Sequence, residues 1–295
     1  MKFFISFLFL AITTLSFSQT LYLDKVSAVS KRTYTYQKNK GEKKLKLDFY
    51  KPKKVKGALP LLLYVHGGGF SGGKRNDKNT VNFANNMAAR GYAVASISYR
   101  LTRKNLGFNC DTKSEDKIKA FNATSEDISY AIKYILSKKR RFKIDINKII
   151  LIGTSAGAEA VLNLAYVHGT KILPEDFKFA GLISMAGAII SLDTITKEKA
   201  IPTQLFHGTD DQLVPYDIDS HHYCKKNNAG YLILFGSKAI AHKLKILGQS
   251  FYLYTIQKGD HSWSGKPMYE CTPEILDFLY YDVLKNKKRQ IQRSI

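Results

Sequence analysis

The sequence has few cysteines, and beyond its first residues it has no long apolar run. The three cysteines, Cys110, Cys224 and Cys271, allow at most one internal disulfide bond and leave one thiol over. No segment after residue 18 reaches the roughly 20 apolar residues that a membrane-spanning helix needs. We therefore expect the mature chain to be soluble, with no integral membrane span.

Acidic residues are also scarce, since 24 Asp and Glu stand against 46 Lys and Arg, a formal net charge of +22. Such an excess raises the affinity for polyanions in general. The lysines are scattered, however, and the sequence contains no zinc-finger, basic-zipper or aromatic RNA-binding pattern. The composition favours weak polyanion binding, with an acidic polysaccharide or a cell-wall surface as partner, and argues against nucleic acid.

Residues 1–18 have the features of a secretory signal peptide. Lys2 precedes an apolar run that begins at Phe3, and the small residues Ser16 and Ser18 form a cleavage site. The run is too short and too interrupted by hydroxyl residues for a membrane anchor, and it has no cysteine for a lipid anchor. The predicted location is secreted or periplasmic, where disulfide bonds persist.

Two stretches are longer than simple connections require, Thr102–Asn122 and Tyr216–Lys238. Both follow predicted strand ends, where long loops usually shape a binding site. Because Cys110 lies in the first and Cys224 in the second, we predict a Cys110–Cys224 disulfide that staples them together. Three free thiols agree with the spacing equally well.

Hydrophobic patterning predicts strands that alternate with helices. Thr33–Tyr36 and Lys44–Tyr50 alternate with period two, as in an edge hairpin, whereas Leu61–Val65 is apolar throughout, as in a strand covered on both faces. This predicts an α/β fold with a doubly wound, mostly parallel sheet of about eight strands. We expect one domain over residues 19–285 and a basic, frayed tail over residues 286–295. Further strands are predicted at Tyr92–Ser98, Ile149–Ile152, Phe179–Met185, Thr203–Phe206 and Phe251–Ile256, and helices at Val81–Arg90, Ser125–Leu136, Ala156–Tyr166 and Pro273–Leu284.

The pentapeptide Gly153-Thr154-Ser155-Ala156-Gly157 lies between a predicted strand and a predicted helix. A serine hydroxyl becomes a useful nucleophile when a sharp strand-to-helix turn thrusts it into a cleft beside a base, and that turn requires small neighbours. Gly153 and Gly157 meet the requirement. The pattern predicts a nucleophile elbow with Ser155 as the nucleophile.

The segment His66-Gly67-Gly68-Gly69-Phe70 directly follows the strand Leu61–Val65. Its glycines let the backbone turn closely past a ligand and aim N–H groups at one point, as the negative charge of a tetrahedral intermediate requires. We predict an oxyanion hole made by the N–H groups of Gly68, Gly69 and Ala156. The alternative is a phosphate-binding loop, but the Lys-Ser/Thr pair of a P-loop and a dinucleotide fingerprint are missing.

On these motifs the chain resembles esterases and lipases of the α/β-hydrolase fold that carry an HGGG oxyanion motif, from about Leu45 to Leu284. Within that superfamily, Gly69-Phe70 followed by Gly72-Gly73-Lys74 is similar to the secreted acetyl- and feruloyl-esterase-like branch. The resemblance implies a serine carboxylesterase that needs no cofactor and no metal. The adjacent His221 and His222 do not predict a zinc site, because no third ligand stands at a metal-binding spacing.

The resemblance also implies the acid and the base. In related enzymes the acid's turn reads His-Gly-Thr-x-Asp-x-x-Val-Pro, which maps the acid onto Asp211, with Asp210 as the alternative. His261 follows the final predicted strand and is the predicted base, whereas His207 is expected to be structural. The chain order Ser155, Asp211, His261 is that of α/β-hydrolases.

The expected activity is hydrolysis of short-chain or carbohydrate-linked acetyl and feruloyl esters through an acyl-serine intermediate. One alternative is a serine peptidase of the prolyl-oligopeptidase type, although the chain has no room for a propeller domain. Another is a catalytically silent binding protein on the same fold, although such proteins typically lose the serine or the histidine. Aromatic residues of the two long stretches are candidates for stacking on sugar or feruloyl rings: Phe108, Phe121, Tyr216, Tyr223 and Tyr231.

Overall fold

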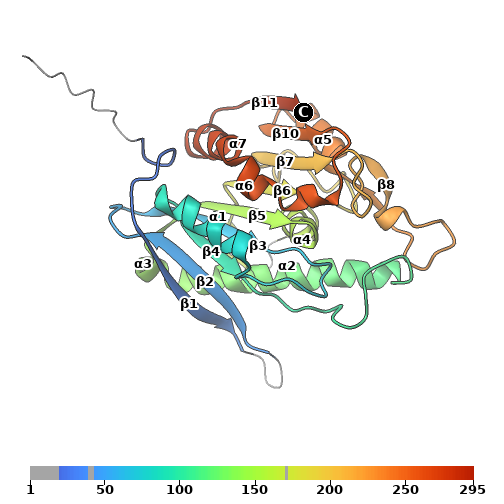
Figure 1. Cartoon of the computed structure of the whole chain (residues 1–295), viewed down its shortest axis with the longest axis horizontal. Coiled ribbons are helices and arrows are strands. Elements are labelled where there is room, and N and C mark those ends of the chain that lie inside the picture. Colours follow the sequence, from blue (N-terminus) through green and yellow to red (C-terminus); the bar gives the residue numbers. More distant parts are fainter. Residues whose placement is uncertain (1–19, 39–42, 170–171) are drawn as a thin grey trace, which may run out of the picture.

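The computed structural model describes residues 20–38, 43–169 and 172–295 (Figure 1). The predicted signal peptide, residues 1–18, and the Asn39-Lys40-Gly41 turn of the predicted hairpin lie outside the described residues. Within these described ranges, no helix combines the length and the apolar character needed to cross a membrane.

A nine-stranded sheet forms the centre of the fold, slightly more than the eight or so strands expected (Figure 1). Its order is β1-β2-β4-β3-β5-β6-β7-β10-β11. β2 pairs antiparallel with β1 and β4, and every other pair is parallel, which confirms a mostly parallel α/β sheet. The strands are β1 Val29–Gln37, β2 Leu45–Pro52, β3 Leu59–Val65, β4 Ala93–Ile97, β5 Ile144–Thr154, β6 Gly181–Met185, β7 Thr203–Gly208, β10 Phe251–Ile256 and β11 Gln290–Ser294, with a separate antiparallel pair β8 Ile218–Ser220 and β9 Ile233–Phe235.

Helices cover both faces of this sheet, which explains the continuous apolar runs in its central strands. In β3, Leu61 and Leu63 pack into one core while Leu62 and Tyr64 pack into the other, since successive side chains of a strand point to opposite faces. The first core includes α2, α4 and α5, and the second includes α1, α6 and α7. The helices are α1 Lys78–Ala89, α2 Ser114–Ser137, α3 Lys139–Phe142, α4 Ala156–Leu162, α5 Ser237–Ile246, α6 Pro267–Glu270 and α7 Thr272–Asp277, with π-helical turns η1 Asn163–His168 and η4 Phe278–Leu284 and 3-10 turns η2 His221–Tyr223 and η3 His261–Ser264.

The expectation of a frayed tail over residues 286–295 is wrong, because this segment contains β11, which pairs in parallel with β10 at the edge of the sheet. Arg289 anchors the segment: its guanidinium forms an ion pair of 2.7 Å with Asp277 and a second one with Asp282. Ile291 packs against the core beside α7. The sequence pattern did not predict this strand, because four of its five side chains are exposed and it shows no alternation of apolar and polar residues. Its backbone pairing with β10 holds it in place.

The two long stretches are more regular than expected. α2 begins at Ser114, so the loop inside Thr102–Asn122 ends there. Its first turn carries Glu115 and Asp116, which favour a helix N-terminus but interrupt the apolar pattern. The second stretch, Tyr216–Lys238, contains β8, η2, β9 and the start of α5. Short elements of three residues lie below the length at which periodicity is readable.

Candidate active site

Ser155 stands in the sharp turn between β5 and α4, with φ 51° and ψ −125°. A non-glycine residue rarely adopts positive φ, and such strain is typical of a nucleophile elbow. Close packing makes the turn depend on its glycines. A Cβ at position 153 would lie 2.3 Å from the Gly157 carbonyl oxygen, and one at position 157 would lie 2.2 Å from that of Val65.

His261 lies beside Ser155 although the two residues are far apart in the sequence. The Ser155 Oγ is 2.8 Å from His261 Nε2, and His261 Nδ1 is 2.7 Å from Asp211 Oδ2. The three residues follow β5, β10 and β7, and the carboxyl ends of parallel strands meet at one edge of a sheet. The structure therefore brings together the three residues predicted as nucleophile, base and acid.

Four donors surround the Asp211 carboxylate. Oδ1 accepts hydrogen bonds from the N–H groups of Leu213 and Val214, at 2.8 and 2.9 Å. Oδ2 faces His261 and, at 3.3 Å, His207 Nε2. Burial alone would raise the pKa of Asp211, but hydrogen bonds from His207 and His261 outweigh burial and hold it well below its ordinary value. An ionised acid at this position keeps the Nδ1 proton of His261 in place.

Asp210, the alternative acid, points elsewhere. It is exposed, and its Oδ1 accepts a hydrogen bond from the neighbouring Thr209 hydroxyl, at 3.0 Å. His207 has a larger part than expected, because its fully buried ring links Ser237 Oγ to the Asp211 carboxylate. It is a positioning residue for the acid.

The oxyanion loop packs directly against the elbow, since a Cβ on Gly67 would lie 3.1 Å from the Ser155 Cβ. Gly68 and Gly69 have positive φ, at 113° and 58°, and a Cβ on Gly68 would lie 2.6 Å from the Gly72 backbone. Among the described residues, the N–H groups of Gly68, Gly69 and Ala156 have no protein acceptor. Both glycines and Ala156 line the cavity that contains Ser155. These N–H groups are available to an incoming oxyanion.

His66 supports this loop from behind. Its Nδ1 is 2.8 Å from the Gly67 carbonyl, its ring stacks on Tyr99 at 4.4 Å, and the Tyr99 hydroxyl donates to the His66 carbonyl at 2.9 Å. Burial lowers the pKa of His66, which favours the neutral ring. The ring is held by packing and is not aimed at Ser155.

A cavity of about 590 Å³ opens onto Ser155. Phe108 and Asn109 from the first long stretch and His221 and His222 from the second line its walls. Of the five aromatic residues proposed for stacking, only Phe108 is among the residues that line this cavity. Phe121 instead packs behind Phe108, with ring centroids 6.2 Å apart.

The predicted Cys110–Cys224 disulfide is confirmed, with Cα atoms 5.3 Å apart. Cys110 follows Asn109 directly and Cys224 ends the turn that carries His222, so the bond ties together the two walls of the cavity. Cys271 is free and buried elsewhere.

Glu159 and His221 form a buried pair in the same cavity that the sequence did not indicate. Glu159 Oε1 is 3.2 Å from His221 Nε2, and the side chains are 2% and 1% exposed. Burial raises the pKa of Glu159 to about 8 and lowers that of His221 to about 3. At neutral pH the cavity wall therefore carries a protonated carboxyl beside a neutral imidazole. One signal was available: Glu159 follows Ser155 by four residues, one helical turn along the same face.

We expect Glu159→Gln to remove a pH dependence of folding stability. Between about pH 4.5 and 8 the folded state keeps the Glu159 proton that the unfolded state releases, so the contribution of Glu159 to folding stability falls as pH rises. The lowered pKa of His221 acts in the opposite direction and is common to wild type and variant. Glutamine cannot titrate, and urea unfolding at pH 5 and pH 8 should show a smaller loss in the variant, by on the order of 3 kcal/mol. Glu198→Gln, at an exposed position, is the matched control. Equal losses in wild type and Glu159→Gln would contradict this role of burial.

No group of three or more His, Cys, Asp or Glu residues that could hold a metal ion occurs in the described part of the chain. The Nε2 atom of His221 faces Glu159 Oε1 at 3.2 Å. Burial lowers the pKa of the neighbouring His222 to about 4.

The fold is shared with solved esterase structures. The apo form of Thermogutta terrifontis esterase 2 superposes with a TM-score of 0.62 at 18% sequence identity, covering 87% of this chain and 94% of that one. The same esterase phosphonylated by cyclosarin gives the same score at 19% identity, covering 85% and 94%. At these identities the likeness establishes the fold.

Sequence relatives are esterases of greater length. Gut esterase 1 of Caenorhabditis elegans is 34% identical over 131 residues, which are 44% of this chain and 22% of the relative. Fumonisin B1 esterase of Sphingopyxis macrogoltabida is 33% identical over 160 residues, which are 53% of this chain and 28% of the relative. The matches thus span about a quarter of these curated relatives.

A family profile, BD-FAE, matches residues 47–198, which is just over half of the chain. The matched segment contains the oxyanion loop and the Ser155 elbow, in which Gly68, Gly153 and Gly157 leave no room for a Cβ. Together with the shared fold, this match identifies the chain as a member of the BD-FAE family of α/β-hydrolase esterases.

Proposed function

We propose that the protein is a serine carboxylesterase that hydrolyses acetyl and other short-chain esters, including carbohydrate-linked acetyl and feruloyl esters. The observation that carries the proposal is the continuous hydrogen-bonded chain from Ser155 Oγ through His261 to Asp211. Membership of the BD-FAE family supports ester substrates. The complete serine and histidine pair argues against a catalytically silent scaffold.

In acylation, His261 Nε2 takes the proton of Ser155 Oγ as the oxygen attacks the ester carbonyl carbon. The carbonyl oxygen becomes an oxyanion and accepts hydrogen bonds from the N–H groups of Gly68, Gly69 and Ala156. One such donor typically lowers the barrier by about 3 kcal/mol. Asp211 stabilises the imidazolium, which then protonates the departing alcohol.

In deacylation, His261 takes a proton from water as the water attacks the acyl-serine carbonyl. A second oxyanion forms in the same hole and collapses to release the acid, and Ser155 recovers its proton from His261. Every proton transfer uses one imidazole nitrogen, so no further acid or base is required.

The cavity supports a short acyl group. Its volume of about 590 Å³ is shared between the acyl and alcohol parts of the ester, and Phe108 and the disulfide-linked walls bound it. Long fatty chains would leave apolar surface in water. Aromatic acyl groups would contact Phe108, whose ring lies edge to face with the His221 ring at a centroid distance of 5.3 Å.

An ester panel tests the proposal. We expect p-nitrophenyl acetate to exceed p-nitrophenyl octanoate in kcat/KM by at least about tenfold. Acetylated xylan and methyl ferulate should also release acid. A fluorophosphonate should transfer its phosphonyl group to Ser155 Oγ with loss of fluoride, which adds the phosphonyl mass to the tryptic peptide that contains Ser155. Faster cleavage of dipeptide amides than of esters would favour the peptidase alternative. Failure of the fluorophosphonate to label Ser155 would favour the silent-scaffold alternative.

We also propose that the protein acts outside the cytoplasm, secreted or periplasmic. The Cys110–Cys224 bond supports this location, because such bonds persist in oxidising compartments. Because Cys271 is buried, the test alkylates protein from its native host in denaturant, before and after reduction, and should reveal one thiol and then three.

A further inference from the structure

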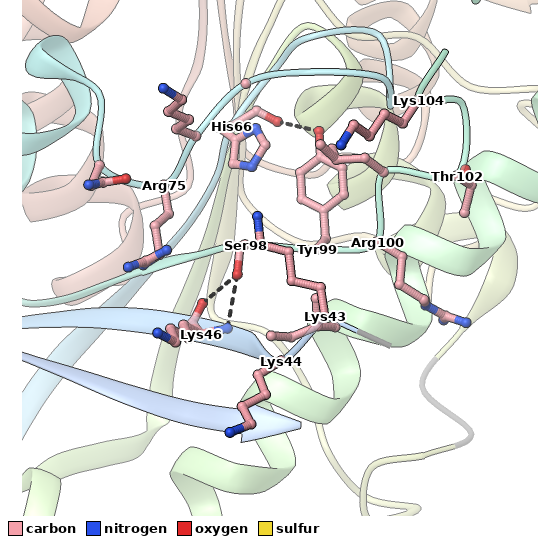
Figure 2. Close-up of a pocket in the computed structure, with 15 residues that line it drawn as sticks. Lys43, Lys44, Lys46, His66, Arg75, Ser98, Tyr99, Arg100, Thr102 and Lys104 are labelled. Atoms are coloured by element: carbon pink, nitrogen blue, oxygen red, sulfur yellow. Dashed lines mark hydrogen bonds between the residues drawn. The ribbon is translucent and has the colours of Figure 1, made fainter. Parts of the chain in front are cut away.

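A second and larger cavity, of about 830 Å³, lies at the same edge of the sheet as the catalytic cavity. Figure 2 shows that residues from three segments surround it: the start of β2, the chain beyond the end of β4 and the loop that follows β3. We call it the basic cavity. No step of the ester mechanism uses its residues.

Positive charge is concentrated around this cavity beyond the general excess of the chain. Among the described residues that line it, seven of fifteen are Lys or Arg and none is Asp or Glu, whereas the whole chain has 46 Lys and Arg in 295 residues. Nearly half of the lining is therefore cationic, against about one residue in six overall. A wall of one charge sign focuses the field and concentrates anions.

Five of these seven cations form no ion pair with any carboxylate that the structure describes. The two arginines have partners, since Arg75 Nε is 3.2 Å from Asp48 and Arg100 Nε is 2.9 Å from Asp127. The lysines are exposed, and among the described residues none of the five lies within ion-pair distance of a carboxylate. These five define the lysine cluster: Lys43, Lys44, Lys46, Lys74 and Lys104.

Two chain segments contribute residues to both the basic cavity and the catalytic cavity. His66 lines the first, and the next residue, Gly67, lines the second. The chain after β4 likewise contributes Lys104 to the first and Phe108 to the second. A hydrogen bond of 3.0 Å from the Arg103 N–H to the Phe70 carbonyl joins the chain after β4 to the loop after β3. A chain-like ligand that enters the catalytic cavity is thus close to the lysine cluster.

We propose that the basic cavity binds the carboxylate or sulfate groups of an anionic polysaccharide whose acyl ester occupies the catalytic cavity. This inference rests on the proposed esterase function and names its substrate class. Lysine ammonium groups on flexible stems suit anionic groups that recur along a chain without one fixed geometry. A neutral polysaccharide would gain nothing from this wall.

Single-stranded nucleic acid fits the cavity less well. Such ligands are held by exposed aromatic platforms as well as by charge. Tyr99 is the aromatic residue among those that line the cavity, but it is 3% exposed and already stacked on His66. The wall thus offers charge without a base-stacking surface.

A triple charge reversal, Lys44→Glu, Lys46→Glu and Lys104→Glu, tests the proposal. The matched control is Lys53→Glu, Lys54→Glu and Lys56→Glu, which changes three exposed lysines beyond the other end of β2. On acetylated polygalacturonate we expect the first variant to lose at least about tenfold in kcat/KM and the control to lose less than about twofold. On p-nitrophenyl acetate and on acetylated xylan free of uronic acid, both should match wild type.

Binding provides a second arm that does not depend on hydrolysis. Unesterified polygalacturonate and a sulfated galactan, cast separately in native gels, should each retard wild type and the control but not the triple variant, and the stronger ligand identifies the anionic group. Equal losses in both triple variants, equal rates of wild type on charged and neutral acetylated chains, or tighter binding of single-stranded DNA than of either glycan would overturn the inference. If p-nitrophenyl acetate is not hydrolysed at all, the esterase function fails instead.

Discussion

Replacing Ser155 with alanine is expected to lower kcat for p-nitrophenyl acetate by about 10⁶-fold, the scale on which loss of the nucleophile acts in other serine hydrolases. Ser155 Oγ is the hydroxyl bonded to His261 Nε2, at 2.8 Å, so its removal leaves water as the nucleophile. The turn should survive, because alanine keeps the Cβ and the backbone of the elbow. Stopped-flow release of p-nitrophenol measures the loss, and near-UV circular dichroism checks the fold.

Ser264→Ala is the matched control, since Ser264 lines the same cavity. It should change kcat less than about threefold, within the range of substitutions that touch no reacting atom. A Ser155→Ala preparation that keeps more than about one per cent of wild-type activity after removal of contaminating esterases would refute the assignment of the nucleophile.

The second largest effect is expected from Asp211→Asn, a loss of about 10⁴-fold in kcat. An asparagine amide at this position would donate to His261 Nδ1 and favour the tautomer with its proton on Nε2. That nitrogen could then not accept the Ser155 proton. The geometry would be kept, since Asp211 and asparagine have the same shape, and KM should change little. Steady-state kinetics separate the two constants.

Asp210→Asn separates the two candidate acids. Because Asp210 is exposed and bonded to Thr209, its replacement should leave kcat within about twofold of wild type. A large loss in Asp210→Asn together with a small one in Asp211→Asn would move the acid to the neighbouring position. Comparable losses in both would mean that the turn as a whole, and not one carboxylate, sets the orientation of His261.

The parts of the fold that could be predicted from the sequence were those where one physical demand dominates. β3 is buried on both faces, so Leu61–Val65 is apolar throughout. The elbow has no room for a side chain at positions 153 and 157, so the two glycines of the pentapeptide motif follow directly from its packing. The resemblance to α/β-hydrolases then implied the acid and the base, through the turn motif that selects Asp211 and the order of the three residues in the chain. The sheet fits this assignment, because parallel strands bring their carboxyl ends to one edge.

Features that depend on contacts between distant segments could not be predicted. β11 is held by backbone pairing and by the Arg289 ion pairs, and its own side chains carry no strand pattern. The proximity of Glu159 to His221 depends on how the second long stretch folds back over α4, which no local spacing encodes. The basic cavity likewise gathers lysines from three separate segments, so the composition showed the charge without its location.

The disulfide has a consequence for how the chain reaches its native state. The bonded cysteines are separated by 114 residues, and the loop they close contains Ser155 and Asp211 but not His261. In the unfolded chain any two of the three cysteines can pair. Once the sheet forms, the core beside α1 encloses Cys271, and burial raises the pKa of its thiol to about 12, so it no longer competes as a thiolate. Folding therefore leaves Cys110 and Cys224 as the two thiols that can react. Oxidation gives the native disulfide most efficiently when it follows assembly of the sheet.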